Sequence, residues 1–251
     1  QQGYVPTGVT QTTRYRRIVN SGLCNNLSNE LEITVNEIPS VTSAPSVTIC
    51  SGTSLNYAIT STVAGTTYSW AVTDLSGGTI AGFSNYPGGT ISTIPDLLVN
   101  NSNVLQSIQY TITPVGPVPT QCPGSPFVLT VSVRPAFTST YTDMGITVGT
   151  NTIISGSIGG GTPGYSYSWT PVSMLSAPAQ ATLANPQTAL LFADQTFNLT
   201  VTDAANCQYV QDITITTGGT LLQVDLSSDD PDQNICFGDQ VTLTATASGG
   251  A

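Results

Sequence analysis

The chain has 251 residues, with fourteen acidic residues, four arginines and no lysine or histidine, for a net charge of −10 at neutral pH. This charge disfavours nucleic acid and anionic membrane surfaces, because both require clustered cations. Without histidine the chain lacks the usual general base near neutral pH, the triads built on it and histidine-ligated zinc. Its apolar runs are too short for a membrane-spanning helix. We therefore expect no catalytic residue, no cofactor, no nucleic-acid partner and no membrane insertion.

Apolar and polar residues alternate with a period of two, and no stretch keeps the 3.6-residue period of a helix. In chain order the alternating runs are 31–35, 55–59, 127–133, 197–201 and 241–245. Clusters of Gly, Pro, Asn and Asp separate these runs. The pattern is typical of antiparallel strands with one buried face, so the sequence predicts an all-β protein.

Three internal repeats set the predicted domain size. Ile-Cys-Ser-Gly at 49–52 recurs as Ile-Cys-Phe-Gly at 235–238, and Tyr-Ser-Trp at 68–70 recurs at 167–169. An aromatic residue, a strand and a cysteine follow one another from Tyr15 to Cys24, from Tyr110 to Cys122 and from Phe197 to Cys207. The shared period of about 90–100 residues is the size of an immunoglobulin-like β-sandwich.

On this period the chain divides into four parts. They are the closing strands of an incomplete immunoglobulin-like domain at 1–37, a complete sandwich at 38–136, a second and shorter one at 137–219, and the opening strands of a further domain at 220–251. Prolines lie at the junctions, where they tolerate extended linkers and block unwanted strand pairing. Because the linkers are short, we expect tandem antiparallel sandwiches in a stiff rod.

Trp70 and Trp169 each lie two residues after a tyrosine, on the predicted third strand of their sandwiches. They could form an aromatic platform for a sugar. We favour the core tryptophan of a sandwich, because the position repeats with the fold. Tyr15, Tyr110 and Phe197 are likewise predicted as core aromatic residues, on the strand that precedes each cysteine.

Five aspartates surround the junction into the last part of the chain: Asp225, Asp229, Asp230, Asp232 and Asp239. Carboxylates there could coordinate calcium and stiffen the joint, which makes the first four weak calcium candidates. Their spacing fits no calcium-loop motif. We therefore favour a solvated acidic linker and predict no metal site.

Two further features are predicted to be loops. The glycine-rich segment 159–164 precedes a strand and has neither a following helix nor a lysine, so it is a loop between strands rather than a phosphate cradle. Asp203, next to the end of a strand, is predicted to be a turn residue.

Several of these motifs resemble repeat domains of bacterial surface proteins. Ile-Cys-Ser-Gly, Tyr-Ser-Trp and the later Tyr-Thr-Ile-Thr-Pro…Cys-Pro-Gly resemble the PKD-like domains of Bacteroidota surface proteins. Gly-Gly-Gly-Thr-Pro-Gly-Tyr-Ser-Tyr-Ser-Trp, with Val-Thr-Asp-Ala-Ala-Asn-Cys, is similar to the PKD and SprB-type repeats of gliding-motility adhesins. The resemblance implies a very large secreted or surface-anchored protein, exported through the outer membrane by the type IX system and acting in adhesion and gliding.

The sequence and the resemblance together predict a structural and adhesive stalk. Its expected partners are neighbouring domains of the same chain, surface polysaccharide and other cell-surface proteins. Two alternatives stay open. One is a spacer or carbohydrate-binding region of a secreted polysaccharide hydrolase. The other is a subunit of an extracellular filament, because the two end parts read as opposite halves of one domain type that a neighbouring copy could complete by strand donation.

The five cysteines are predicted to form disulfides in an oxidising compartment. In an immunoglobulin-like sandwich Cys50 and Cys236 follow the first strand, whereas Cys24, Cys122 and Cys207 end the sixth, at the opposite end of the domain. Strands of about six to ten residues separate these ends by roughly 20–30 Å, beyond the ~7 Å limit between bridged Cα atoms. We therefore expect Cys50 to pair with Cys207 of the next domain rather than with Cys122. Cys122 and Cys236 are expected to pair with cysteines outside this sequence.

Overall fold

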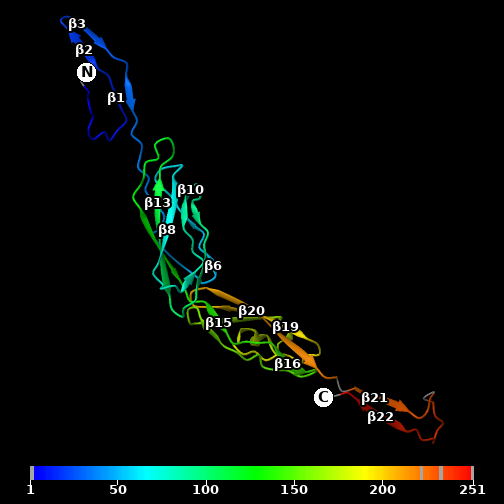
Figure 1. Ribbon diagram of the computed structural model, residues 1–251. Helices are drawn as coiled ribbons and strands as arrows, with labels where there is room; N and C mark the ends of the chain where they lie inside the picture. The colour runs from blue at the N-terminus through cyan, green and yellow to red at the C-terminus, as the bar shows by residue number, and fades with distance from the viewer. Residues whose placement is uncertain (1–2, 221–222, 232–233, 250–251) are drawn as a thin grey trace. The chain divides into compact units, whose positions relative to one another are not determined.

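The computed structural model describes residues 3–220, 223–231 and 234–249 and divides into two compact units, Gln1–Arg134 and Pro135–Ala251 (Figure 1). The first unit holds an N-terminal hairpin and a sandwich, and the second holds a sandwich and a C-terminal hairpin. The described residues form β-strands and two short 3-10 helices, with no α-helix. The prediction of an all-β, immunoglobulin-like fold is confirmed.

The N-terminal hairpin consists of four short strands: β1 (Thr13–Tyr15), β2 (Ile18–Ser21), β3 (Cys24–Leu27) and β4 (Leu31–Ile33). β1 pairs antiparallel with β4, and β2 pairs antiparallel with β3. Its apolar side chains, among them Leu23, Leu27 and Leu31, are exposed. The hairpin therefore has no core of its own among the described residues.

One layer of the first sandwich is a five-stranded sheet in the order β10–β8–β13–β14–β5. These strands are β5 (Ser46–Ile49), β8 (Thr67–Asp74), β10 (Tyr86–Gly89), β13 (Gln106–Val115) and β14 (Phe127–Val133). The opposite layer holds β6 (Thr53–Ser54), β7 (Tyr57–Ala58), β9 (Ile80–Ala81), β11 (Thr93–Ile94) and β12 (Leu97–Asn100). Alternate residues of β13 and β14 point inward, so that Ile108, Ile112, Leu129 and Val131 are fully buried.

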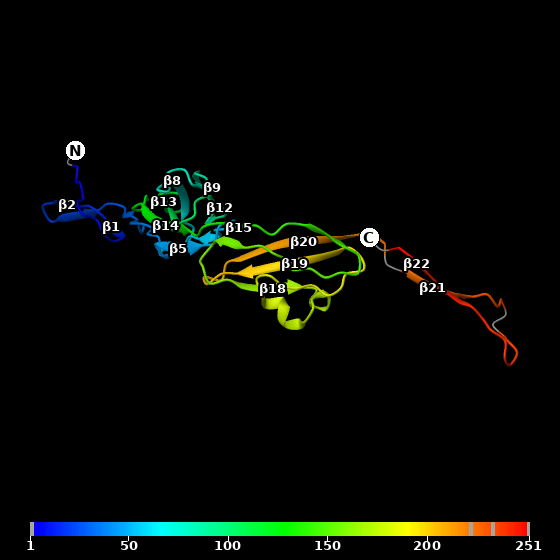
Figure 2. The ribbon, with the colours of Figure 1, turned by 90° about the horizontal axis from the view of Figure 1, so that it is seen from below.

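The second sandwich has a four-stranded sheet in the order β16–β20–β19–β18 (Figure 2). Its strands are β16 (Met144–Thr147), β18 (Ser166–Thr170), β19 (Gln195–Thr202) and β20 (Gln208–Gly218). The opposite layer contains the pair β15 (Phe137–Ser139) and β17 (Ile158–Gly160), with the 3-10 helices η1 (Val172–Met174) and η2 (Pro178–Thr182) packed against β18. Phe197, Leu199, Ile213 and Ile215 are fully buried between the two layers.

Each sandwich also contains one parallel pair, which the alternation does not predict. β5 runs parallel to β14, with Val47 opposite Val131, and β16 runs parallel to β20, with Met144 opposite Ile215. The opening strand of each sandwich thus lies beside its closing strand. The two ends of the domain's own chain are thereby joined within one sheet.

The C-terminal hairpin pairs β21 (Gln223–Ser228) antiparallel with β22 (Leu243–Ser248), and all residues of both strands except Ser228 are exposed. The two cores lie elsewhere. The first draws on residues from Val41 to Val133 and the second on residues from Phe137 to Ile215. These limits fall inside the predicted parts 38–136 and 137–219, while the four-part division itself stays a prediction.

Candidate functional site

The two tryptophans are buried, with exposed fractions of 5% for Trp70 and 0% for Trp169. Trp70 on β8 donates from Nε1 to the Ser84 carbonyl at 3.1 Å, and Trp169 on β18 donates to the Leu183 carbonyl at 2.9 Å. A buried indole needs such an acceptor, because an unpaired N–H in the core is costly. Neither ring offers a face to solvent, so neither forms a sugar platform in this structure.

Tyr110 on β13 is also fully buried. Its hydroxyl donates to the Asp96 carboxylate at 2.6 Å, and the same carboxylate accepts the Ser84 N–H at 2.9 Å. Burial and then the hydrogen bond to Asp96 raise the pKa of Tyr110. These hydrogen bonds hold the segment before β12 against the sheet, so Tyr110 and Asp96 stabilise the fold.

The other two predicted core aromatic residues differ from each other. Phe197 on β19 is fully buried in the second core. Tyr15 on β1 is only half-buried, with its ring centroid 6.2 Å from that of Tyr4. No second layer covers β1 among the described residues, so a core position for Tyr15 stays a prediction.

Tyr141, which sequence reasoning did not single out, occupies the second core beside Trp169. The two rings meet edge to face with centroids 5.5 Å apart, and the Tyr141 hydroxyl donates to the Ala184 carbonyl at 2.6 Å. Burial, with a smaller contribution from Tyr167, raises the pKa of Tyr141 to about 12. Its alternating context, Ser-Thr-Tyr-Thr, is the only sequence signal, and many exposed strands share it.

Asp203 is buried, with 3% of its surface exposed, and follows β19. Its carboxylate accepts three backbone N–H groups, from Thr162 at 2.7 Å, Ala205 at 2.8 Å and Cys207 at 2.8 Å. The prediction of a turn residue thus describes only part of the role of Asp203. Asp203 ties the glycine-rich loop to the turn that carries Cys207.

That turn lies at the end of the second sandwich where the chain enters it. The glycine-rich segment, predicted to be a loop over 159–164, begins inside β17, which pairs with β15, with Gly160 opposite Phe137, and continues as a loop beyond it. A Cβ at Gly160 would lie 1.9 Å from the Ala136 carbonyl oxygen, so the two segments are in close contact. Cys207, clamped to the same loop through Asp203, therefore lies near the first residues of the unit.

Cys50 lies at the end of the first sandwich where the chain leaves it. The Arg134 N–H donates to the carbonyl of the residue before Cys50 at 3.0 Å. Asn100, which is fully buried, donates its backbone N–H to the Ser51 hydroxyl at 2.9 Å and its side-chain amide to the Val133 carbonyl at 2.8 Å. These bonds hold the Cys50 turn against the last residues of the unit.

Cys50 and Cys207 are both disulfide-bonded, whereas Cys24, Cys122 and Cys236 are free. The pair that proximity in the sequence would favour, Cys50 with Cys122, is therefore absent. The geometry gives the reason, because Cys122 follows β13, whose last residues lie beside the first residues of β14, at the end opposite to Cys50.

Two aspartates of the C-terminal hairpin accept backbone hydrogen bonds, one across the hairpin and one within a turn. Asp229 accepts the Thr242 N–H at 2.8 Å, and this hydrogen bonding lowers the pKa of the Asp229 carboxyl. Asp239 accepts the Cys236 N–H at 3.1 Å. Among the residues that the structure describes, no group of three or more carboxylate and cysteine side chains could hold a metal ion.

The remaining calcium candidates are scattered. Asp225 on β21 accepts the Gln223 side-chain amide at 2.9 Å, and the Asp230 N–H donates to the Ser228 hydroxyl at 3.0 Å. Asp232 lies outside the described residues. Calcium binding at this junction stays an untested hypothesis.

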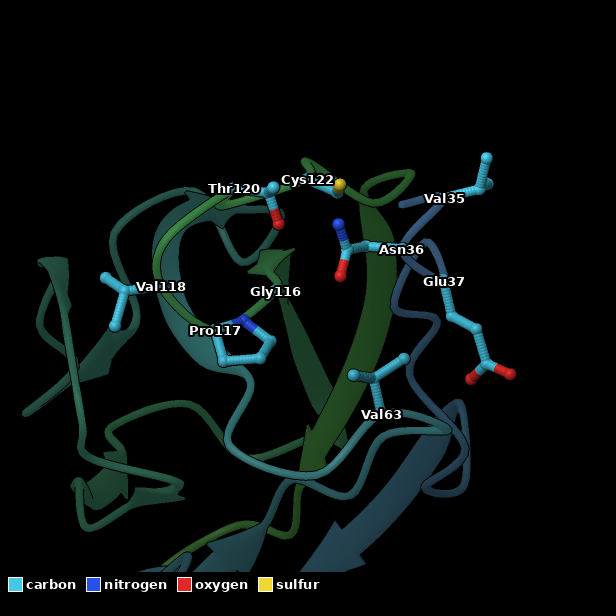
Figure 3. A pocket seen from close by; sticks show the side chains of 9 residues that line it. All are labelled: Val35, Asn36, Glu37, Val63, Gly116, Pro117, Val118, Thr120 and Cys122. Carbon is cyan, nitrogen blue, oxygen red and sulfur yellow. The ribbon is translucent and has the colours of Figure 1, made fainter. Parts of the chain in front are cut away.

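A cavity of about 300 Å³ lies at the Cys122 end of the first sandwich (Figure 3). Its lining consists of Val35, Asn36, Glu37, Val63, Gly116, Pro117, Val118, Thr120 and Cys122. The Cys122 thiol and the Glu37 carboxylate are its two ionisable groups, and in Figure 3 the Glu37 side chain points away from Cys122. A nucleophile needs a base within hydrogen-bond reach, so this pair is not arranged for covalent catalysis.

The two successive sandwiches define a tandem β-sandwich protein. In the part of the chain that the structure describes, no helix is long and apolar enough to span a membrane. The sequence profile of the PKD-like domain family matches residues 47–137, which cover the first sandwich. No protein of curated function matches the sequence.

Solved multi-domain structures show limited similarity. The EC21-23 segment of human CDH23 is 11% identical, with a TM-score of 0.30, over 86% of this chain and 81% of that chain. The EC1-4 segment of Drosophila N-cadherin is 13% identical, with a TM-score of 0.31, over 97% of this chain and 69% of that chain. A three-domain immunoglobulin segment of titin is 11% identical, with a TM-score of 0.33, over 82% of this chain and 75% of that chain.

Proposed function

We propose that this chain is a non-catalytic, load-bearing segment of an extracellular repeat protein, a stalk that carries an adhesive region away from the cell. The observation that carries the proposal is the position of the two disulfide-bonded cysteines. Cys50 is held at the end of the first sandwich by Arg134, and Cys207 is held near Ala136 at the start of the second.

In this proposal Cys50 and Cys207 pair with each other. The other three cysteines of the chain are free, so each of the two is the one candidate partner of the other within a single copy. Arg134 and Ala136 are two residues apart, which leaves little chain between the segments that hold the two cysteines. Such a bond also requires an oxidising compartment, which supports an extracellular location.

The proposed bond has a mechanical consequence. A force applied to the two ends of the chain passes from Cys50 directly to Cys207 and bypasses the 156 residues between them. Those residues contain most of both cores, since β6 through β19 lie inside the closed loop. Tension therefore cannot extend them while the bond is intact, which suits a stalk.

Single-molecule stretching of the whole chain, tethered at its two ends, tests this role. We expect the fully stretched chain to be shorter by about 560 Å with the bond intact than after reduction, from 156 residues at ~3.6 Å each. Cys50→Ser should behave like the reduced chain, and Cys24→Ser should behave like the oxidised one. Equal lengths before and after reduction would refute the role.

The surface location and the adhesive partners are further parts of the proposal. The PKD-like match over 47–137 supports an extracellular repeat protein. Secretion by the type IX system and attachment to the outer membrane are proposed from the sequence resemblance to gliding-motility adhesins alone. Its partners would be neighbouring domains, surface polysaccharide or other surface proteins. Antibodies against residues 38–219 should label intact cells of the source organism, and labelling confined to lysed cells would contradict this location.

The spacer of a polysaccharide hydrolase is the weaker candidate. Sugar-binding surfaces need exposed aromatic rings, whereas Trp70 and Trp169 are buried and hydrogen-bonded. We also propose that 38–219 has no catalytic activity of its own. Incubation with polysaccharide, ester and peptide substrates should give no turnover, and turnover that is lost when one carboxylate is mutated would overturn the proposal.

A further inference from the structure

We infer that residues 38–42 form a strap that holds the chain against the first sandwich where it enters and that opens while the sandwich stays folded. The strap connects residues 35–37, which line the cavity of Figure 3, with the segment that leads to β5. The inference does not depend on the stalk role or on the Cys50 to Cys207 pairing. It rests on a close contact at Gly124, on the hydrogen bonds of the strap and on the exposure of its residues.

Pro39 anchors the strap. It is buried, although its neighbours Ile38 and Ser40 are exposed. A Cβ on Gly124 would lie 2.1 Å from the Pro39 carbonyl oxygen, and a Cβ on Gly116 would lie 3.8 Å from Pro39 Cδ. Both glycines belong to the connection between β13 and β14, so this connection packs against the ring and the carbonyl group of the proline.

The contact with Pro39 explains why position 124 is a glycine. Gly124 does not have a positive φ, so its backbone conformation is open to other residues. A methyl group there would lie 2.8 Å from Pro114 Cγ as well. The more severe clash is the one with the backbone of Pro39, and a shift of the strap relieves it. A single methyl group at Gly124 therefore tests the strap.

The second sandwich makes the same kind of contact where the chain enters it. Pro135 is buried, and a Cβ on Gly160 would lie 1.9 Å from the Ala136 carbonyl oxygen. The two glycines come from different elements, since Gly160 lies on β17. Gly160 also has a φ of +71°, which by itself favours glycine, so Gly124 gives the cleaner test.

Hydrogen bonds join the strap to the connection between β7 and β8. The Thr42 N–H donates to the Thr60 carbonyl at 2.8 Å. The Thr62 N–H donates to the Ser40 carbonyl at 3.0 Å, and the Ser40 N–H donates to the Thr62 hydroxyl at 3.1 Å. Val41 forms an isolated antiparallel bridge with the same connection, so the strap acts as a short additional strand.

The strap is more exposed than the sheet of the same sandwich. Its residues Ser40 and Thr42 and their partners Thr60 and Thr62 are all exposed, and Val41 is only half-buried at the margin of the core. In β13 and β14, by contrast, alternate side chains are buried. Segments with few buried apolar contacts and solvent-exposed hydrogen bonds open at a lower free-energy cost than the whole domain. The strap can therefore open on its own.

Opening of the strap changes the cavity beside it. Residues 35–37 supply one part of the lining, and Val63 and the connection from Gly116 to Cys122 supply the rest (Figure 3). Residues 35–37 directly precede the strap, so they are released with it. The Cys122 thiol, which is half-buried while the strap is closed, then becomes more accessible.

The test is amide hydrogen exchange, followed by mass spectrometry, on the whole 251-residue chain. Gly124→Ala should speed exchange of the Ser40 and Thr62 amides by about ten-fold or more, because the methyl group displaces the strap. The central amides of β13 and β14 should keep their wild-type rates. Gly116→Ala is the matched control, since it adds the same methyl group to the same connection with no neighbour closer than 3.4 Å, and it should leave the strap protected.

A second variant makes the test independent of how well Gly124→Ala folds. Thr62 is exposed, and Thr62→Val removes the acceptor of the Ser40 N–H with little change in the size of the side chain. Exchange of the strap amides should rise about five-fold, as expected for the loss of one hydrogen bond.

Thiol labelling measures the effect on the cavity. In a chain that carries Cys24→Ser and Cys236→Ser, Cys122 is the remaining free thiol. Gly124→Ala should speed its reaction with a maleimide several-fold, and Gly116→Ala should not. Equal rates in these two variants would overturn the step from the strap to the cavity.

The exchange experiment has three outcomes that would overturn the inference. Unchanged exchange of the strap in both Gly124→Ala and Thr62→Val would show that these contacts do not hold it. Equal release by Gly116→Ala would assign the effect to a general disturbance of the connection. Equal acceleration in the strap and in β13 and β14 would show that the strap opens only when the sandwich unfolds.

Discussion

Both sandwiches bury a tryptophan at an equivalent position and give its ring nitrogen the same kind of acceptor, but different elements cover the ring. In both, the indole nitrogen donates to a carbonyl fourteen residues further along the chain. The Trp70 ring then lies against Tyr86 on the neighbouring strand β10, with centroids 4.5 Å apart. The Trp169 ring instead meets Tyr141 from a distant loop and the 3-10 helix η2.

This difference shows which part of the fold is fixed. The sheet that carries the tryptophan and its long neighbours keeps its register in both units, because every second residue there is buried. The covering layer needs only to fill volume and to satisfy the ring nitrogen. Strands do this in the first sandwich, and loops with 3-10 turns do it in the second.

The largest effect should come from removing the ring. Trp169→Ala should destabilise the second sandwich by about 3–5 kcal/mol, because it empties the centre of the core. Trp70→Ala should do the same to the first sandwich. Calorimetry should resolve two transitions, with each variant lowering a different one. A single transition that shifts equally in both variants would show that the two cores do not melt separately.

The sequence predicts the sheet better than the covering layer. Alternation locates the strands around 127–133 and 197–201, because burial of one face imposes a period of two. The repeat of Tyr-Ser-Trp predicts that both rings are buried. The same local reasoning gives no sign of η1 and η2, whose turns are fixed by packing on β18 rather than by a periodic pattern.

Hydrogen-bond partners that are distant in the chain are equally hard to predict from the sequence. Asp96 and Tyr110 are fourteen residues apart, and nothing in either segment specifies their hydrogen bond. Asp203 reads as an ordinary turn residue, since the Thr162 donor comes from another loop. The opposite positions of Cys50 and Cys122, in contrast, follow from strand order alone, which is why the absence of a bond between them could be predicted.

The next largest effect concerns buried aspartate. Asp203→Ala should destabilise the second sandwich by about 3 kcal/mol, because three N–H groups, one buried and two part-buried, lose a charged acceptor. Asp203→Asn, which keeps one carbonyl acceptor, should cost less. Chemical denaturation of the three proteins measures the order. Equal stability of Asp203→Ala and wild type would mean that water replaces the carboxylate, and the clamp on the Cys207 turn would then be unimportant.

A smaller effect is expected in the second sandwich at alkaline pH. The pKa of Tyr141 is raised to about 12 from the usual tyrosine value of 10.0, so the folded state keeps its proton where the unfolded state loses it. Stability is therefore fully present below about pH 10 and falls as the pH rises from 10 towards 12. Tyr141→Phe should be less stable at pH 8, by about 1 kcal/mol for the lost hydrogen bond, yet should lose less stability between pH 10 and 12. Parallel curves for the two proteins would rule out this contribution.

The smallest effect is expected at acidic pH in the first sandwich, at the turn after β8. Asp74 accepts the Ser76 N–H at 2.7 Å and the Gly78 N–H at 2.7 Å, and hydrogen bonds from the Ser76 side chain, the Ser76 backbone and the Gly78 backbone lower the pKa of its carboxyl below 3.8. A lowered pKa in the folded state stabilises above pH 3.8, and this stability is lost as the pH falls through the lowered value. Asp74→Asn removes the charge and keeps an acceptor, so its melting temperature should lie slightly below that of wild type at pH 6. The gap should close as the pH falls through the lowered pKa of Asp74, because protonation neutralises the wild-type carboxylate there. Thermal melts over a series of acidic pH values measure the gap, and a gap that persists at the most acidic pH would assign the cost of the substitution to the shape of the turn instead of to the charge.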